Sequence, residues 1–173
     1  MIAAFDFFTV PTVTFQLLYC FFVIEHGRRR ILHFNVTRHP TAEWVVQQLR
    51  EAFPAAGPYR YTIFDRDSTF PEEVVIFLEA TGLKAKRTSV QAPWQNGTAE
   101  RWVGSCRRDL LDHVIVLNER HLRRLMAEYV RYYHEDFACV GKILMNHRIA
   151  MSYSQRHADS HLMCPLFHTL TDK

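Results

Sequence analysis

Apolar residues fill most of the first 37 positions in three runs, at 2–10, 15–25 and 30–37. Runs of this length that are rich in aromatic and β-branched residues predict strands. Pro11 ends the first run, and a polar turn at 26–28 separates the second run from the third. We therefore expect an antiparallel meander of three strands at the start of the chain.

The spacing of apolar residues changes to three and four positions after Pro40, which predicts a helix that opens at Thr41 and closes before Pro54. The expected buried face of this helix consists of Val45, Val46, Leu49 and Phe53. A short apolar stretch at 61–65 follows and is expected to be a buried strand.

A second helix is predicted between positions 69 and 81. Thr69-Phe70-Pro71-Glu72 matches a capping box with proline in the first turn, and Gly82 supplies the stop signal. The stretch 83–87 is compatible with another strand. After Ser89, a segment punctuated by glycine and proline predicts a loop.

Two further helices complete the pattern. The first begins near Asn96, and its apolar positions recur at three- and four-residue steps: Ala99, Trp102, Val103, Cys106 and Leu110. The second begins at Asn118, with Leu117 and Leu122 placed as a hydrophobic staple. Its expected apolar stripe consists of Leu122, Leu125, Met126, Tyr129, Val130 and Tyr133. The order of elements predicts an α/β fold with a five-stranded mixed sheet, three antiparallel strands and then two parallel ones, flanked by helices.

Three acidic residues stand in distinctive settings along this pattern. Asp6 and Asp65 are expected at the ends of apolar, strand-like runs, and Glu100 lies one turn into a helix-like run. Carboxylates that converge repel one another unless a cation joins them, and an all-oxygen ligand set suits Mg²⁺ or Mn²⁺. If the fold gathers the three, the expected chemistry is two-metal phosphoryl transfer.

The surroundings of these acids carry a family resemblance. Asp65 is followed by Ser68 and Phe70, residues 66 to 99 separate it from Glu100, and the segment Pro-Trp-Gln-Asn-Gly-Thr-Ala-Glu-Arg occupies 93–101. Over about 2–136 the chain resembles the integrase-like catalytic core of transposases from bacterial insertion sequences, a group within the retroviral integrase superfamily. One departure concerns position 67, where the family usually has glycine and this chain has Asp67, a possible substitute for Asp65.

The resemblance implies a ribonuclease-H-like fold on which Asp6, Asp65 and Glu100 are the catalytic, metal-binding triad. It implies two Mg²⁺ or Mn²⁺ ions, DNA as the partner, and cleavage of element ends followed by strand transfer into target DNA. A homo-oligomer is expected when the chain is part of an active assembly.

Basic residues gather near the third acid. Between Lys84 and Arg108 the only acid is Glu100, whereas the net charge of the whole chain is only +3. A solvated basic face and a surface for phosphodiesters both fit this charge pattern. The candidate DNA contacts are Lys84, Lys86, Arg87, Gln91, Asn96, Arg101, Arg107 and Arg108. Asn96 is equally a candidate for starting its helix, and Trp94 is a candidate for stacking on a base or for covering the sheet.

Both ends of the chain depart from the family pattern. The first strand begins at Met1, without the helix-turn-helix region that such transposases carry upstream, and the likeness fails beyond Asp136. We expect a catalytic core at 1–136 and a divergent, poorly packed tail at 137–173. A frameshifted or truncated remnant of an insertion sequence is a hypothesis that accounts for both ends.

Two other functions remain open at this stage. The chain could be an inactive or regulatory fragment that pairs with full-length transposase through the helical face around Leu125 and Tyr129. It could also be a ribonuclease-H-like nuclease acting on RNA–DNA hybrids, although that class is not expected to carry the Asn-Gly-x-Ala-Glu context. A zinc site at His157, His161, Cys164 and His168 is a weaker alternative, because no second pair stands at finger-like distance.

The remaining composition narrows the setting. The four cysteines form no Cys-x-x-Cys pair, which fits a reducing compartment, and the longest uninterrupted apolar stretch, 17–24, is too short to cross a bilayer. Asp6 interrupts the first apolar run, which argues against a secretory signal. A cytoplasmic protein without membrane association is therefore expected.

Overall fold

The first three strands form the expected meander. The computed structural model describes residues 1–54, 57–65, 70–89 and 96–135. Strands β1 (Ile2–Pro11), β2 (Leu17–Glu25) and β3 (Ile31–Thr37) pair antiparallel in sequence order. Strands β4 (Tyr61–Phe64) and β5 (Lys84–Arg87) add in parallel beside β1, giving the sheet order β3-β2-β1-β4-β5. The predicted five-stranded mixed sheet is confirmed.

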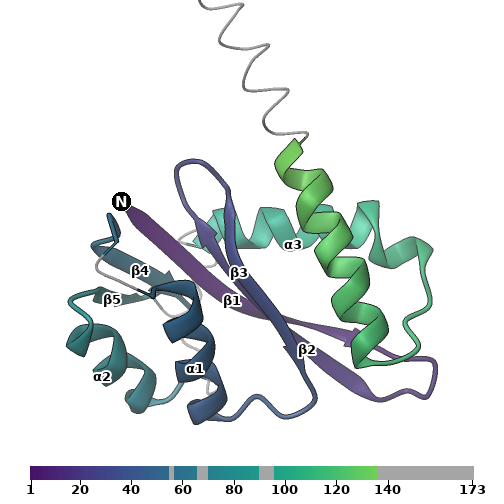
Figure 1. Cartoon of the computed structure of the whole chain (residues 1–173), viewed down its shortest axis with the longest axis horizontal. Helices are drawn as coiled ribbons and strands as arrows, with labels where there is room; N and C mark the ends of the chain where they lie inside the picture. Colours follow the sequence, from purple (N-terminus) through teal and green to yellow (C-terminus); the bar gives the residue numbers. More distant parts are fainter. Residues whose placement is uncertain (55–56, 66–69, 90–95, 136–173) are drawn as a thin grey trace, which may run out of the picture. The chain divides into compact units, whose positions relative to one another are not determined.

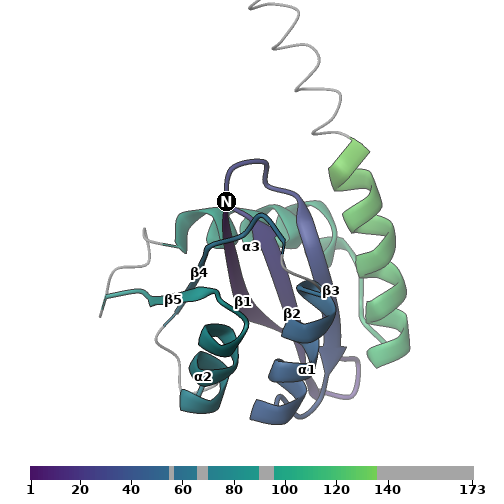
Figure 2. The same cartoon turned by 60° about the vertical axis from the view of Figure 1, so that its left-hand side comes forward.

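Helices cover both faces of the sheet (Figure 1). Helices α1 (Ala42–Ala52) and α2 (Glu72–Ala80) lie on one face. Helix α3 (Gly97–Asp109) and the helix over 119–135 lie on the other, joined by the short 3₁₀ helix η2 (Leu111–His113), and the turned view in Figure 2 separates the two layers. Within the described ranges, every helix is too short or too polar to cross a membrane.

Side chains alternate between the two faces along each strand. On β1, Ala3 and Phe5 join the apolar cluster under α1 and α2, whereas Ala4 and Phe8 join the cluster under α3. Each cluster is rich in aromatic rings: Phe5 stacks on Phe64 at 4.8 Å on the first face. On the second face, the ring centroids of Trp102 on α3 and Phe22 on β2 are 4.3 Å apart.

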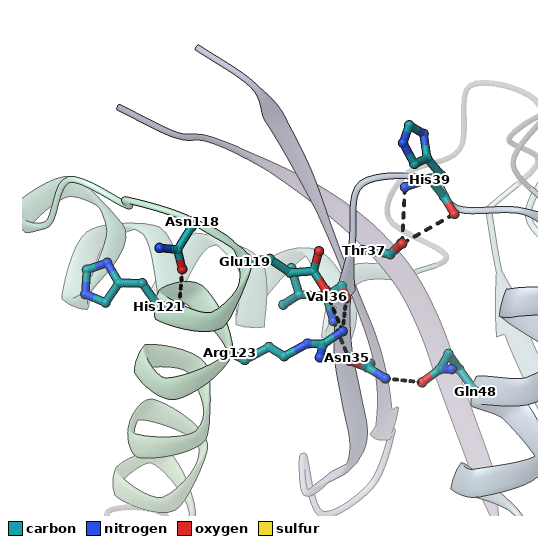
Figure 3. A network of polar contacts seen from close by, with 9 residues as sticks. All are labelled: Asn35, Val36, Thr37, His39, Gln48, Asn118, Glu119, His121 and Arg123. Carbon is teal, nitrogen blue, oxygen red and sulfur yellow. Dashed lines mark hydrogen bonds and ion pairs between the residues drawn. The ribbon is translucent and has the colours of Figure 1, made fainter. Parts of the chain in front are cut away.

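Side chains bond backbone groups along β3, the strand at one edge of the sheet. The Arg123 guanidinium donates to the Val36 carbonyl (2.8 Å), and Val36 N–H donates to Asn35 Oδ1 (2.8 Å), as Figure 3 shows for the side of β3 between α1 and the 119–135 helix. Ile31 N–H donates to His134 Nε2 (2.9 Å). These bonds blunt an edge that would otherwise be open to pairing with another strand.

Helix ends agree with the sequence at some positions and differ at others. Thr41 caps α1 through its hydroxyl, and Gly82 ends α2 with a φ of 81°. Helix α2 begins at Glu72, after an N-cap residue, Pro71, that has no side-chain cap bond, and the predicted cap residue Thr69 lies outside the described residues. The Pro71 carbonyl accepts a hydrogen bond from Val74 N–H (3.1 Å), which closes the first turn.

The start of the last helix shows the same mixture. Asn118 caps it by accepting a hydrogen bond from His121 N–H (2.9 Å), as predicted. Leu117 is 54% exposed and stays outside the cluster that buries Leu122, so the hydrophobic staple is not formed. The expected apolar stripe is confirmed, since Met126 and Tyr129 are buried and the rest of the stripe is buried or packs against the cluster.

Candidate carboxylate site

Asp6 lies in the middle of β1, the central strand. It is opposite Phe22 of β2, and its carboxylate accepts a hydrogen bond from Phe7 N–H (2.7 Å). The placement of Asp6 at the end of a strand-like run is therefore wrong. By alternation with Ala4 and Phe8, Asp6 faces the layer that contains α3.

Asp65 lies directly after β4 and beside β1. The parallel register pairs Ala4 with Ile63, so a continuation by two residues brings Asp65 level with Asp6. Ile63 packs against the cluster under α3, and alternation gives Asp65 the same face. The continued register thus places the two acids, 59 positions apart in sequence, beside each other on one side of the sheet.

A threonine holds the second acid. The Thr88 hydroxyl, one residue beyond β5, donates to Asp65 Oδ1 at 2.7 Å, and Thr88 N–H bonds the Phe64 carbonyl at 3.0 Å. Thr88 is buried, so its hydroxyl is a fixed donor. A hydrogen bond of this kind orients a carboxylate without neutralising it.

Glu100 reaches the same region from α3. It lines a hollow of about 510 Å³ together with Asp6 and Tyr19, and Gly104 and Arg107 follow on the same side of α3. Ala99, one position earlier, is buried against the sheet, which leaves Glu100 exposed at the margin of the packed face. Helix α3 thus packs on the face of the sheet to which Asp6 belongs.

The structure brings the acids together pairwise rather than as a closed trio. Asp6 and Asp65 meet through the strand register, and Asp6 and Glu100 meet through the hollow. Among the described residues, no three His, Cys, Asp or Glu side chains lie close enough to hold one metal ion together. Asp67, the alternative to Asp65, lies outside the described residues.

The basic residues of β5 divide between the two faces of the sheet. Lys86 pairs in register with Ile63 and therefore shares the face of Asp65, as does Lys84. The Arg87 guanidinium lies over the Phe64 ring and is 3.3 Å from Glu72 of α2, on the opposite face. Arg87 thus lies away from the acids with which the sequence grouped it.

Helix α3 carries the other basic candidates. Arg107 Nη2 lies 3.5 Å from the Thr9 carbonyl, at the border of the carboxylate hollow. Arg101 is exposed, and Arg108 lies 3.5 Å from Ser105 Oγ. The helix therefore presents an acidic residue, Glu100, and a positively charged residue, Arg107, to the same hollow.

Asn96 occupies the N-cap position of α3 without capping it. Its side chain makes no cap hydrogen bond, although the residue is only 1% exposed. Neither its amide nitrogen nor its amide oxygen has a hydrogen-bond partner in the described structure. Buried polar groups are nearly always bonded, so Asn96 is an exception among the described residues, and its contact with DNA stays a prediction.

Other candidates fall beyond what the structure describes. Gln91 and Trp94 belong to this group, as do the proposed zinc ligands His157, His161, Cys164 and His168 and the whole predicted tail. Thr88, by contrast, is described and was missed by the sequence reading. Alternation from Lys84 and Lys86 would have placed it beside Asp65.

The described thiols are not part of the site. Cys20 and Cys106 are fully buried and reduced, and burial raises the pKa of Cys106 to about 12. They pack as small apolar residues.

Comparisons with known proteins agree with this geometry. Residues 81–136 match the family described as Integrase core domain. The catalytic domain of the Mos1 mariner transposase superimposes with a TM-score of 0.64 at 12% identity, over 75% of this chain and 69% of that one. The HTLV-2 integrase catalytic core domain, in complex with magnesium, superimposes with a TM-score of 0.54 at 13% identity, over 72% of this chain and 80% of that one.

A third likeness involves a longer protein. A chain of the simian T-cell lymphotropic virus intasome complex superimposes with a TM-score of 0.59 at 12% identity, over 72% of this chain but only 46% of that one. Our chain therefore spans less than half the length of that relative. Among curated proteins, none is significantly similar in sequence.

The structural likenesses, at 12–13% identity, establish the fold, and the sequence match adds the family for the segment with β5, α3 and Glu100. Residues 81–136 of this chain match an integrase core domain, and the described structure has the ribonuclease-H-like fold of integrase and transposase catalytic domains.

Proposed function

We propose that this domain cleaves DNA phosphodiesters and transfers the strand, as a transposase or integrase catalytic core. The observation that supports the proposal is that Asp6 and Glu100 line one hollow, while the parallel register of β1 and β4, continued by two residues, leads to Asp65 beside Asp6. Carboxylates gathered on one face, with basic side chains around them, suit a polyanionic substrate and divalent cations.

The donor set fits Mg²⁺ or Mn²⁺, because all three candidate ligands offer oxygen. Ions bound by Asp6, Asp65 and Glu100 would supply an activated water or 3′-hydroxyl and stabilise the leaving oxygen. Thr88 would keep the Asp65 carboxylate in one orientation. Arg107 would hold a phosphate at the border of the hollow.

The competing role as a pairing fragment loses the surface suggested for it. Tyr129 is 5% exposed and Leu125 packs against the cluster under α3, so the helical face around them is part of the core. Exposing that face would require the 119–135 helix to leave the sheet. A regulatory fragment would need a different contact.

Cleavage assays test the proposal directly. The purified chain is incubated with Mn²⁺ or Mg²⁺ and labelled duplex DNA, with an RNA–DNA hybrid as the comparison substrate. We expect nicking of duplex DNA that Asp65→Asn and Glu100→Gln each reduce by about 10²–10³-fold, because bound metals contribute several kcal/mol to such reactions.

The matched control is Glu128→Gln, an exposed acid on the 119–135 helix, which should retain full activity. Cleavage restricted to the hybrid would favour the ribonuclease-H-like alternative. An absence of metal-dependent cleavage of either substrate would refute the proposed activity for this chain.

The face assignment of the basic residues allows a sharper test of DNA binding. Lys86→Gln should weaken duplex binding regardless of sequence and lower the slope of log affinity against log salt by about 1. Arg87→Gln, on the opposite face and beside Glu72, should leave the slope unchanged. Equal effects of the two changes would contradict a DNA surface on the carboxylate face.

A further inference from the structure

A second hollow adjoins the carboxylate hollow. It also has a volume of about 510 Å³ and is bounded by the end of β1, the turn at 12–15 and the segment 111–116. Thr9 and Arg107 line both hollows. A strand of DNA engaged at the carboxylates would therefore pass directly beside the second hollow.

An exposed aromatic ring stands at its rim. Phe15 is 91% exposed and has a φ of 58°, a conformation that costs a residue with a Cβ about 1–2 kcal/mol. The turn imposes this conformation: Phe15 N–H donates to the Thr12 carbonyl (2.9 Å), and Thr12 Oγ1 accepts from Gln16 N–H (3.1 Å). The ring is thus presented to solvent by a backbone that is held in place.

The surface around the ring is apolar and extends across two segments. Val13 is 52% exposed and Ile115 is 72% exposed, and Val13 N–H bonds the Val116 carbonyl (2.8 Å), which ties the turn to the second segment. Contiguous exposed apolar surface of this kind marks a binding site. Nucleobases stack on aromatic rings irrespective of sequence.

The charges at the rim suit a nucleotide. Arg107 lies between the two hollows, where a phosphate linking the site to the next nucleotide would pass. Asp112 lines the second hollow and can accept a hydrogen bond from a base amino group. An apolar pocket of this size with few polar groups is typical of a small planar ligand.

We propose that this hollow binds an unpaired nucleobase of the DNA strand held at the carboxylates, with Phe15 as the stacking platform. The inference rests on the proposed function, because it takes DNA as the substrate of the neighbouring site. A base that leaves the duplex stack loses stacking energy, and Phe15 would replace part of it.

The test measures binding by fluorescence anisotropy in Ca²⁺, which takes oxygen ligands as Mg²⁺ does and so keeps a cation at the carboxylates. Two labelled duplexes are compared, one fully paired and one with a single unpaired 2-aminopurine. Phe15→Ala should weaken binding of the second duplex by about 5–100-fold and leave the first within about twofold, since one base–aromatic stack contributes about that much. Phe15→Trp should retain the preference, and 2-aminopurine fluorescence should be quenched only when an aromatic residue is present.

Ile76→Ala is the control, because Ile76 is 60% exposed on α2, on the other face of the sheet. Identical binding of the two duplexes by wild-type protein, or equal effects of Phe15→Ala and Ile76→Ala, would overturn the inference while cleavage by wild-type protein still supported the proposed function. A Phe15-dependent preference in a chain that never cleaves would refute the activity alone. If Phe15→Ala converts a dimer to a monomer in sedimentation and does not specifically weaken binding of the duplex with the unpaired base, the inference fails. The hollow would then be an interface between copies of this chain.

Discussion

The two faces of the sheet are built from the same strands, yet they differ in what the central strand β1 contributes to them. Under α1 and α2, β1 contributes Ala3, Phe5 and Phe7 without interruption. Under α3, the same strand contributes Ala4, Asp6 and Phe8, so that a carboxylate stands between two core residues. The first face can be filled with rings, whereas the second must leave space around an acid.

One face of the sheet therefore contributes mainly to stability, and the other carries the candidate site. Phe5, Phe64 and Phe70 fill the first face with mutual ring contacts of 4.8–5.7 Å. On the second face, the packed cluster around Trp102 stops at Glu100, and the hollow begins there. Period-two alternation is what allows adjacent residues to serve these two purposes.

The largest expected effect concerns two adjacent phenylalanines of β2. Phe21 faces α1 and Phe22 faces α3, and both are fully buried. Phe21→Ala and Phe22→Ala should each lower the free energy of unfolding by about 3–5 kcal/mol, through lost burial and the cavity left behind. Urea unfolding midpoints measure this, with Ile76→Ala expected to stay within about 0.5 kcal/mol.

Milder changes at the same positions would distinguish the faces. Phe22 lies opposite Asp6 and stacks near Trp102, so Phe22→Leu should lower the cleavage rate of folded protein, whereas Phe21→Leu should leave it unchanged. Equal losses of rate would show that the two faces are not functionally separate.

The alternation that separates the faces is also what made the fold predictable. The strand at 2–10 was expected from its apolar run, and the observed β1 differs by one residue. The helix with Ala99, Trp102 and Cys106 was expected from its spacing and buries those residues. In both cases a local period matches the geometry that the backbone can adopt.

The errors arose where tertiary structure decides the outcome. The strand expected from position 15 begins at Leu17, because hydrogen bonds to Thr12 turn the chain at apolar residues that remain exposed. Apolarity alone does not report burial. Arg87 was grouped with Lys84 and Lys86 by proximity in sequence. Because side chains alternate along a strand, Arg87 points to the face opposite the two lysines.

The next prediction, in order of size, concerns the support of Asp65. Thr88→Val removes the hydroxyl that donates to Asp65 while keeping the shape of the side chain. Loss of a partner that orients a metal ligand typically costs about 10–100-fold in metal affinity or activity. The Mn²⁺ concentration for half-maximal cleavage and the dissociation constant for Mn²⁺ should therefore both rise.

Thr62→Val is the matched control from the other face. The Thr62 hydroxyl is buried and has no hydrogen-bond partner in the described structure. Removing it should leave metal affinity unchanged and should maintain or raise stability, because an unsatisfied buried group is lost. A shared effect of both changes on metal affinity would contradict the positioning role of Thr88.

A smaller effect is expected from pH at the edge of the sheet. His134 Nε2 must be neutral to accept the Ile31 N–H bond, and burial, aided by Arg30, lowers the pKa of His134 below its usual 6.5. The folded state therefore binds this proton more weakly than the unfolded state does, so the contribution is complete above about pH 6.5 and is lost as the pH falls below it. Urea unfolding at pH 5–8 measures the free energy of unfolding of wild type and of His134→Phe. The two should differ by no more than the contribution of one hydrogen bond, about 1 kcal/mol, and the difference should disappear at acid pH. A difference that grows at acid pH would contradict the neutral acceptor.

The smallest expected effect separates folding from binding at the turn beside the second hollow. Phe15→Gly relieves the cost of a positive φ but increases the flexibility of the unfolded chain, so stability should rise by about 0.5 kcal/mol. Because the ring is exposed, little burial is lost with it. The variant should then be slightly more stable in thermal unfolding and yet lose the preference for an unpaired base. Stability and binding that fall together would mean that Phe15 packs against the fold rather than serving a ligand.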